Sequence, residues 1–422
     1  MSRYYRIEEV CIVRGGKRIP QGCTLQIDAN SHPYIRILDM YQGRILNISK
    51  EMQYAKDDYW NVIKNYTVKS GDVILAIVGN TLGMVSIIGD TLDGANLTEN
   101  CCKFDELDTN IVRSLFLYYS LISPLNQKII EKFKVGSSQP KLPIYNINQL
   151  LIPKMDVTVQ DKITGLLSAI DSRIENNIKI NTELESMAKA IYDYWFLQFE
   201  FPNEDGEPYK SSGGEMVWNE ELKREIPEGW KVKGLEYFGL LSNGINYDKE
   251  EAGDKKYKIV NVRNISSSLL FVNKSELDEI VLKANVADKY LLKRNDILIA
   301  RSSIPGAVRV LDDIDNTIYC GFIIRLELPS DLYRSYLVYQ LKGYENTTAT
   351  TSGGTIMQNV SQSTLKRLRF AVPDKKSVLT FNQKVYSIWA MIKVHMNENE
   401  ELISLRKYLL PLLMNGQIVF KE

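Results

Sequence analysis

Two stretches of the chain, 163–195 and 381–413, place residues of one helical face at spacings that alternate between four and three. This heptad pattern is typical of a helix that pairs with another helix along an apolar seam. The first seam consists of Ile163, Leu167, Ile170, Ile174, Asn177, Asn181, Leu184, Ala188, Ile191 and Trp195. The second consists of Phe381, Val385, Ile388, Ile392, His395, Asn399, Leu402, Arg406, Leu409 and Leu413. We therefore predict two long helices that pair with each other, folded back through the chain between them.

Both seams turn polar at the same place. Each member of the second seam follows its counterpart by 218 residues, so that His395 and Asn399 correspond to Asn177 and Asn181. Polar residues at seam positions cost stability, but they fix the register and the number of helices that associate.

Two residues of the second stretch depart from this pattern. Arg406 interrupts the seam where Ala188 continues it, and the neighbouring Leu405 offers an apolar substitute. Pro411 removes a backbone donor and clashes with the preceding turn, so it is predicted to kink or end the second helix.

The regions before the two helices also resemble each other, which predicts a duplicated domain. Each region has an amphipathic start that ends on a glycine turn, then a Lys…Asp turn with two β-branched strands, then a polar loop, a short helix and a closing proline. The matching pairs are "IEEVCIVRGG" (7–16) with "LEYFGLLSNG" (235–244), "YTVKSGDVILAIVGNTLGMVSII" (66–88) with "YLLKRNDILIARSSIPGAVRVL" (290–311), and "VGSSQPKLPIYNINQLLIP" (135–153) with "TSGGTIMQNVSQSTLKRLRFAVP" (351–373).

The stretch between the repeats is rich in Gly, Pro, Ser and acidic residues, and we expect it to be an extended linker. The predicted organisation is a first domain at 1–153, a first helix at 154–200, the linker at 201–230, a second domain at 231–372, and a second helix with the C-terminal tail at 373–422.

Composition predicts a folded protein of more than one domain. The 422 residues are 44% hydrophobic and 25% charged, and the formal net charge is zero. The chain has no long apolar run and its start has no apolar signal core, so we expect no membrane association. Five cysteines without a CxxC spacing favour a reducing compartment, hence the cytoplasm, and disfavour a thiolate zinc site.

Motifs of common enzymes are missing from the sequence. The stretch "RGGKRI" lacks the spaced glycine of a phosphate-binding P-loop, and the chain has no Pro-Pro pair of the kind that adenine methyltransferases carry. Two histidines, His32 and His395, are too few for a histidine-rich zinc site. Asp205, Glu221 and Lys223 imitate a nuclease metal motif, but they lie in the linker and such a pattern is common by chance. We expect no catalytic residue, no cofactor and no metal.

The whole chain resembles the specificity (S) subunits of type I restriction-modification systems. The resemblance rests on the duplicated architecture and on an ordered series of phrases: "GSSQPKL", "DSRIENN", "ESMAKAIYDYWF", "EIPEGWKV" and "YLLPLLMNGQI". The second loop, "SGGTIMQ", departs from the "GSSQPK" form.

The resemblance implies α+β target-recognition domains with mixed, curved sheets, joined by two long helices in an antiparallel coiled coil. It implies that each domain reads one half of a bipartite, asymmetric site in double-stranded DNA. The helices would set the gap between the halves and dock two modification (methyltransferase) subunits, and restriction (endonuclease and translocase) subunits would complete the complex. The S subunit itself would be non-catalytic.

Loops that follow strands and carry basic, amide or hydroxyl side chains are the candidates for DNA contact, because these groups bind phosphates and base edges. In the first domain the candidates are Arg14, Lys17, Arg18, Asn80, Thr81, Ser137, Ser138, Gln139 and Lys141. In the second they are Arg263, Arg301, Ser302, Ser303, Thr355, Gln358 and Asn359.

Two other classes of protein remain open from the sequence. A coiled-coil adaptor that binds no DNA fits the neutral net charge. An enzyme with an unrecognised motif is the other class, although no motif favours it.

Overall fold

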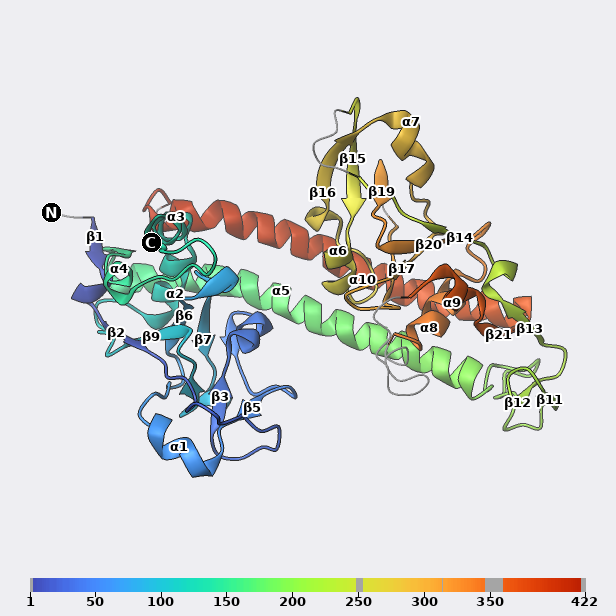
Figure 1. Ribbon diagram of the computed structural model, residues 1–422, viewed down its shortest axis with the longest axis horizontal. Coiled ribbons are helices and arrows are strands. Elements are labelled where there is room, and N and C mark those ends of the chain that lie inside the picture. The colour runs from blue at the N-terminus through green and yellow to red at the C-terminus, as the bar shows by residue number, and fades with distance from the viewer. Residues whose placement is uncertain (1–2, 248–252, 313, 346–359, 419–422) are drawn as a thin grey trace. The chain divides into compact units, whose positions relative to one another are not determined.

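The computed structural model describes residues 3–247, 253–312, 314–345 and 360–418 (Figure 1). The chain forms two compact units that do not follow its order. The first unit consists of Met1–Arg173 with Glu401–Glu422, and the second consists of Ile174–Glu400. Each unit thus contains one globular domain and part of both long helices, α5 (Val157–Tyr192) and α10 (Lys375–Met414).

The first unit has two sheets and one further strand pair. The five-stranded sheet has the order β2 (Ile12–Gly15), β9 (Cys101–Asp105), β6 (Val73–Ala76), β7 (Val85–Ile88) and β4 (Ile45–Leu46). The three-stranded sheet has the order β5 (Gln53–Tyr54), β3 (Pro33–Ile35) and β8 (Asn96–Leu97). Most pairs are antiparallel, but β4 with β7 and β3 with β8 are parallel. In addition, β1 (Tyr4–Arg6) pairs antiparallel with β10 (Leu151–Pro153), which joins the two ends of the domain.

Helices α2 (Ser114–Ile122), α3 (Pro124–Phe133) and α4 (Ile144–Ile147) lie beside the larger sheet of the first unit. Helix α1 (Asp57–Ile63) packs instead against Tyr34 of β3 in the smaller sheet. Helix α2 is apolar on all sides and is buried, as expected for a helix enclosed by other elements. Ser123 separates α2 from α3, because its side chain caps α3 and Pro124 occupies the first turn, where the missing amide costs nothing.

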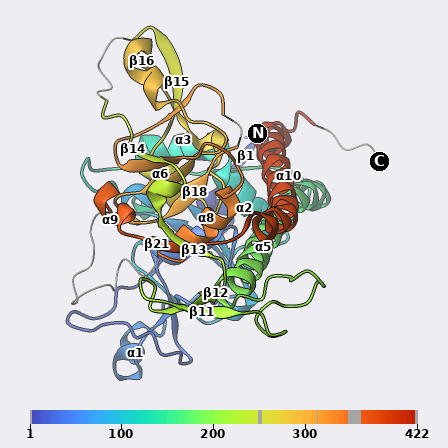
Figure 2. The ribbon, with the colours of Figure 1, turned by 90° about the vertical axis from the view of Figure 1, so that its right-hand side faces the viewer.

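The second unit repeats the strands of the first in the same order, except that β4 has no counterpart. Its four-stranded sheet is β14 (Leu240–Asn243), β20 (Ile323–Glu327), β17 (Ile297–Ala300) and β18 (Val308–Val310). Its three-stranded sheet is β16 (Asp278–Leu282), β15 (Lys255–Val260) and β19 (Thr317–Tyr319), with β15 and β19 parallel. The pair β13 (Lys231–Gly234) and β21 (Arg369–Val372) joins the domain ends (Figure 2). Its short helices are α6 (Val262–Ser266), α7 (Ala284–Ala287), α8 (Arg334–Lys342) and α9 (Gln362–Lys366).

The duplication predicted from the sequence is therefore visible in the strand order. β2, β9, β6 and β7 correspond to β14, β20, β17 and β18, while β5, β3 and β8 correspond to β16, β15 and β19. The predicted α+β class, with mixed sheets and two long helices, is confirmed.

The two long helices run antiparallel within each unit. In the second unit, Asn177 of α5 bonds Asn399 of α10, whereas Asn181, four residues further on, bonds His395. The seam residues Ile163, Leu167, Ile170, Ile174, Leu184, Phe381, Val385, Ile388 and Ile392 are buried, and Ile191, Leu402 and Leu409 are half-buried.

Three expectations about local structure need correction. Leu405 does not replace Arg406 in the seam, because Leu405 is 44% exposed. Instead Arg406 forms an ion pair with Asp171, a buried residue of α5 that also accepts a hydrogen bond from the Tyr119 hydroxyl (2.6 Å). The prediction that Pro411 ends its helix is wrong, since α10 continues to Met414. The lost hydrogen bond is offset by burial of Leu413 and Met414 in the first unit's core.

The third correction concerns 201–230, which is ordered rather than extended. It forms the hairpin of β11 (Met216–Asn219) and β12 (Arg224–Pro227). Its apolar side chains decide this outcome: Phe201, Ile226 and Trp230 are buried in the second unit's core, and the rings of Phe201 and Trp230 stack 5.1 Å apart. That the segment links two recognition domains stays a prediction.

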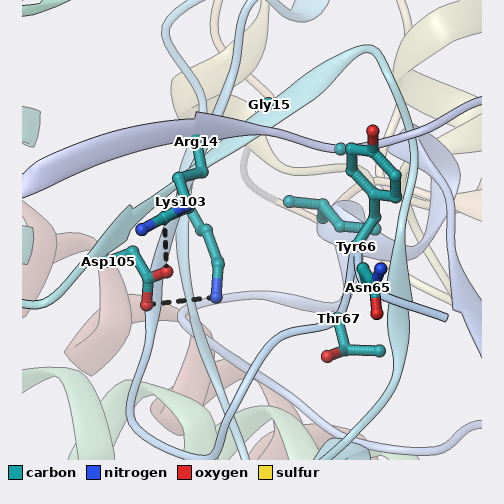
Figure 3. A pocket seen from close by; sticks show the side chains of 9 residues that line it. Arg14, Gly15, Asn65, Tyr66, Thr67, Lys103 and Asp105 are labelled. Atoms are coloured by element: carbon teal, nitrogen blue, oxygen red, sulfur yellow. Dashed lines mark ion pairs between the residues drawn. The ribbon is translucent and has the colours of Figure 1, made fainter. Parts of the chain in front are cut away.

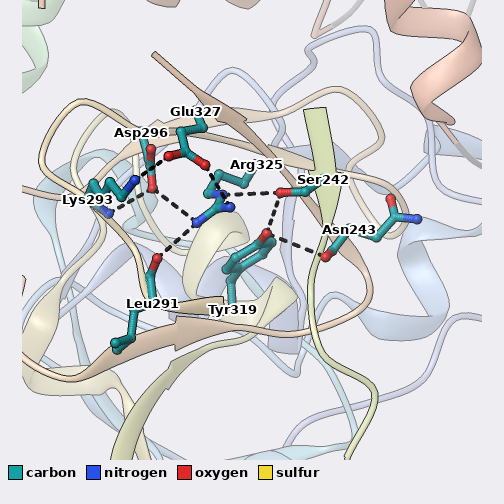
Figure 4. A network of polar contacts seen from close by, with 8 residues as sticks. All are labelled: Ser242, Asn243, Leu291, Lys293, Asp296, Tyr319, Arg325 and Glu327. Carbon is teal, nitrogen blue, oxygen red and sulfur yellow. Dashed lines mark hydrogen bonds and ion pairs between the residues drawn. The ribbon is translucent and has the colours of Figure 1, made fainter. Parts of the chain in front are cut away.

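A buried ion cluster lies at the same place in both domains. In the second unit, Arg325 of β20 lies between Asp296 (3.8 Å) and Glu327 (2.9 Å). Figure 4 shows Arg325 also facing Ser242 and the ring of Tyr319. The backbone N–H of Lys293 donates to Asp296 (2.8 Å), and burial raises the pKa of Asp296 to about 6.

In the first unit Lys103 takes the place of Arg325. Its ammonium group lies 3.9 Å from Asp72 and 3.2 Å from Asp105, and the Lys69 N–H donates to Asp72 (2.8 Å). Lys103 faces Arg14 of β2 in the same register in which Arg325 faces Ser242 of β14. Burial raises the pKa of Asp72, whereas Lys103 and Arg14 lower the pKa of Asp105 although burial alone would raise it. Duplication has therefore preserved a cation between two carboxylates beneath each edge strand.

Replacing Arg406 with Leu should lower the free energy of unfolding by about 2 kcal/mol, less than the 3–5 kcal/mol of a fully buried pair. The reason is that Asp171, 3% exposed, would lose its cation, while Arg406 itself is 32% exposed and its charge is partly screened. Urea unfolding measures the loss. The matched control, Asp171→Leu with Arg406→Leu, should recover most of it. An equally unstable double variant would show that packing, not the unpaired charge, matters.

Asp296→Asn should change how stability depends on pH. A folded-state pKa near 6, against about 3.9 when unfolded, means that the folded state holds a proton in that interval. The contribution of Asp296 to wild-type stability should therefore fall as pH rises from about 4 to 6 and then level off. The variant lacks this titrating group. Between pH 4 and 7 the difference in unfolding free energy between the two proteins should therefore shift in favour of the variant by up to about 3 kcal/mol. Parallel pH profiles of the two proteins would contradict the burial argument.

Candidate functional site: the strand-end loops

The loop after β2 begins at a fixed position and then turns toward solvent. Arg14 is held by Asp105 (2.8 Å) and Glu106 (2.6 Å), so its charge is already matched. A Cβ on Gly16 would lie 2.2 Å from the Thr98 carbonyl oxygen, so only glycine fits this crossing. Gly244 is constrained in the same way by the Cys320 carbonyl, again at 2.2 Å.

Beyond this crossing, the first-domain loop carries two more cations. The Lys17 ammonium lies 5.5 Å from the centroid of the Tyr66 ring. The Arg18 side chain is 81% exposed, and its guanidinium lies 3.7 Å from the Glu99 carboxylate. Of the three basic residues predicted here, Lys17 and Arg18 are therefore available to an external anion, whereas Arg14 is engaged within the domain.

A cavity of about 400 Å³ lies beside this loop. Figure 3 shows Arg14, Lys103 and Asp105 on one side of it and Asn65, Tyr66 and Thr67 on the other. In the second domain Tyr319 occupies the position of Leu97: the N–H of Ile245 bonds the carbonyl of Tyr319, as the N–H of Lys17 bonds that of Leu97. The Tyr319 hydroxyl bonds Ser242 (2.8 Å), and its ring packs against Arg325.

Lys103, Asp72 and Asp105 were missed as site residues. A signal existed, because the aligned phrases "YTVKSGD" and "YLLKRND" end in corresponding carboxylates, the half-buried Asp72 and the buried Asp296. The cations, however, come from strands about 30 residues further on, and nothing in the sequence marks them as partners.

A second group of predicted residues comes together at the end of β6. The N–H of Gly79 donates to the Pro140 carbonyl (2.8 Å), and the N–H of Leu142 donates to the Ile77 carbonyl (2.9 Å). These bonds bring Asn80 and Thr81 to the same edge as the loop 136–141. Asn80, Ser137, Ser138, Gln139 and Lys141 are exposed, and Thr81 is half-buried.

The second domain anchors its corresponding loop in the same way. The N–H of Val360 donates to the Arg301 carbonyl (2.9 Å), so Arg301 occupies the position of Ile77. The Arg301 guanidinium does not project freely, because it donates to the Gly321 carbonyl (2.9 Å). Ser302 is half-buried, and Ser303 is exposed with a left-handed backbone (φ 68°). Thr355, Gln358 and Asn359 lie outside the described residues.

Arg263 is the remaining candidate, and it lies apart from this edge, on α6. Its guanidinium forms an ion pair with Asp278 (2.5 Å), although its side chain is 62% exposed. The structure thus brings together the candidates of loops 79–81 and 136–141, and separately those of the loop after β2.

Within the described ranges, no group of His, Cys, Asp and Glu side chains has the arrangement of a metal site. All five cysteines are free thiols, and burial raises the pKa of Cys11 to about 12 and also that of Cys320. No helix in the part of the chain that the structure describes combines the length and apolarity that a membrane span requires.

Comparison with known proteins gives consistent matches. Residues 2–186 match the model of the type I restriction modification DNA specificity domain. The type I restriction enzyme HindI specificity subunit of Haemophilus influenzae is 24% identical over 465 residues, covering 95% of this chain and 98% of the relative. The MjaIX specificity subunit of Methanocaldococcus jannaschii is 26% identical over 334 residues, covering 74% of this chain and 70% of the relative.

The fold has a counterpart among solved structures. A crystal structure of the S subunit of a type I restriction-modification system from M. genitalium aligns with a TM-score of 0.50 at 15% identity, covering 97% of this chain and 95% of that one. The matching domain model and the relatives aligned over most of their length agree with each other, and the chain is similar to the specificity subunits of type I restriction-modification systems.

Proposed function

We propose that the chain reads a bipartite, asymmetric site in double-stranded DNA, with one domain for each half. The observation that carries this proposal is a repeated backbone bond. In each domain the residue that follows a polar stretch of sequence, Leu142 or Val360, donates its N–H to the residue just after the same strand, β6 or β17. The recognition domains keep the bounds 1–153 and 231–372. In this function the chain is the specificity subunit and performs no catalysis itself.

Two domains together supply the sequence discrimination that a single domain lacks. A good bidentate base contact discriminates by about 1–3 kcal/mol. Selecting one site among a million or more competitors requires about 8 kcal/mol, which is difficult for a domain that reads three or four base pairs. The paired helices would set the gap between the two half-sites. They would also dock two modification subunits, to which restriction subunits are added.

The loop residues divide into two proposed roles. Lys17, Arg18 and Lys141 are exposed cations, which suits phosphate contacts that orient the domain. Asn80 and Gln139 carry exposed amides at one edge, and amides are the side chains that read adenine. The structure favours phosphate roles less for Arg14 and Arg263, because carboxylates already engage both.

A coiled-coil adaptor that binds no DNA is the second candidate, favoured by the zero net charge. Affinity for duplex DNA that falls steeply with salt, and that appears or tightens when modification subunits are added, separates the two functions.

The first test is a methylome. We expect co-expression with a modification subunit, in a host without DNA methylation, to give adenine methylation at one bipartite motif with a fixed gap. Exchanging residues 231–372 for the corresponding domain of a relative should change one half-site and leave the other intact. A soluble complex without any new methylation would favour the adaptor, and two altered half-sites would contradict the assignment of one half to each domain.

Lys17→Ala with Arg18→Ala should weaken binding about equally for all DNA sequences. Each lost phosphate contact reduces the slope of log affinity against log salt by about 0.9, so the double variant should lose about 1.8. Fluorescence anisotropy across a salt series measures the slope. The control is Arg14→Gln, for which an unchanged slope is expected because Asp105 and Glu106 already neutralise Arg14. If Arg14→Gln reduced the slope and the double variant did not, Arg14 rather than Lys17 and Arg18 would contact phosphates.

A further inference from the structure

The middle of the helix pair contains two consecutive polar layers. In one layer the Asn177 amide donates to Asn399 (2.9 Å) and to Glu398 (2.9 Å). In the next layer Asn181 bonds the ring of His395 (2.8 Å) and the carbonyl of Ile392 (3.3 Å). All these residues belong to the second unit. We call the four seam residues Asn177, Asn181, His395 and Asn399 the polar centre.

Only in the observed register do the two polar-centre residues of α5 face the two polar-centre residues of α10. The two layers are exchanged by the duplication, because His395 and Asn399 are the counterparts of Asn177 and Asn181. Sliding one helix by a heptad keeps every seam position facing another seam position, so the apolar pattern alone tolerates the slide. In one direction such a slide would bring the polar centre against apolar residues: Asn177 against Ile392, Asn181 against Ile388, His395 against Ile174 and Asn399 against Ile170. In the other direction Asn181, His395 and Asn399 would face Leu402, Ala188 and Leu184, and Asn177 would face Arg406.

Stability alone does not explain the polar centre. Asn177 is fully buried, and its Oδ1 atom has no hydrogen-bond partner among the described residues. Well-packed apolar residues generally stabilise such a position more than polar ones, whereas a buried Asn at a seam position is the best-attested device for fixing register.

We propose that the polar centre determines the gap between the half-sites by excluding every register of the helix pair but one. This inference rests on the proposed function, because it specifies how the helices set the gap. Each domain is continuous with one helix, the first with α5 and the second with α10. A slide of one heptad would therefore displace the domains by about 10 Å along the helices. That distance corresponds to about three base pairs of DNA.

Spin-label distances in the full chain report the register without any DNA. Labels are placed at Glu183→Cys on α5 and Val394→Cys on α10, both exposed, in a Cys23→Ser background because the other four cysteines are buried. We compare the wild-type sequence with a fourfold variant, Asn177→Leu, Asn181→Leu, His395→Leu and Asn399→Leu. The matched control changes two exposed polar residues of the same turns, Lys179→Leu and Asn397→Leu.

We expect one distance for the wild type and the control, and an additional, longer distance for the fourfold variant. The two labels lie nearly opposite each other across the helix pair, so a slide of about 10 Å along the helices lengthens the distance between them. The fourfold variant should also unfold at a higher temperature than the wild type, since the buried polar cost is removed. A single unchanged distance in the fourfold variant would overturn the inference, because the domains alone would then hold the register.

A second variant covers the case in which the fourfold variant does not fold. His395→Leu with Asn399→Leu changes α10 only and removes the polar seam residues that Asn177 and Asn181 face in the observed register. We expect this variant to lose its single distance too, and retention of one distance would count against the polar centre.

Methylome mapping of the same variants tests the link to DNA. A second motif with the same half-sites and a gap changed by about three base pairs would support both proposals. A split distance without methylation at any gap would leave the register inference standing and count against the proposed function. A split distance with the gap unchanged would show that the register does not set the gap.

Discussion

Pairing of α5 with α10 is the constraint on which both domains depend, because each unit completes its hydrophobic core with residues from both helices. In the first unit Ile163 and Leu167 share a core with Leu410 and Leu413. In the second, Leu184 and Ala188 share one with Ile388 and Ile392. Neither unit is thus a continuous stretch of chain. The first core remains incomplete until the last residues of the chain arrive, and such long-range contacts slow folding.

The second constraint is electrostatic, and it acts beneath the candidate loops. A cation between two carboxylates underlies the edge strands β2 and β14, although the cation is lysine in one domain and arginine in the other. Without the cation the two carboxylates would lie close together uncompensated, so both domains keep a cation at this position. The cluster is therefore present in both domains, although the neighbouring residue is Leu97 in the first and Tyr319 in the second. The loops above can vary because their starting point is held independently of their sequence.

The long helices and the duplication could be predicted from the sequence, because a seam repeats its spacing over many turns and a repeated domain repeats its phrases. Isolated side-chain partnerships could not. Arg406 looked like a defect of the seam because its partner, Asp171, lies one position beside the seam on a helix more than 200 residues earlier. Segment 201–230 was predicted to be a linker because most of its residues are polar. The few aromatic residues that pack into the core are a small part of its composition. Arg301 was a candidate for DNA contact because the sequence does not mark its hydrogen-bond partner, the Gly321 carbonyl, which lies in the turn between β19 and β20.

Because the loop attachment is the same in both domains, one scaffold can carry loops of two different amino-acid sequences. The bond from Leu142 to Ile77 and the bond from Val360 to Arg301 involve only backbone atoms, so neither constrains the side chains that follow. The two loops have accordingly diverged, from "GSSQPK" to "SGGTIMQ", while their attachment has not. A site read by two such domains is asymmetric because the loops differ, and bipartite because the attachments are separate. Within the proposed function, the asymmetry of the DNA site follows from side chains, and its two-part form follows from the fold.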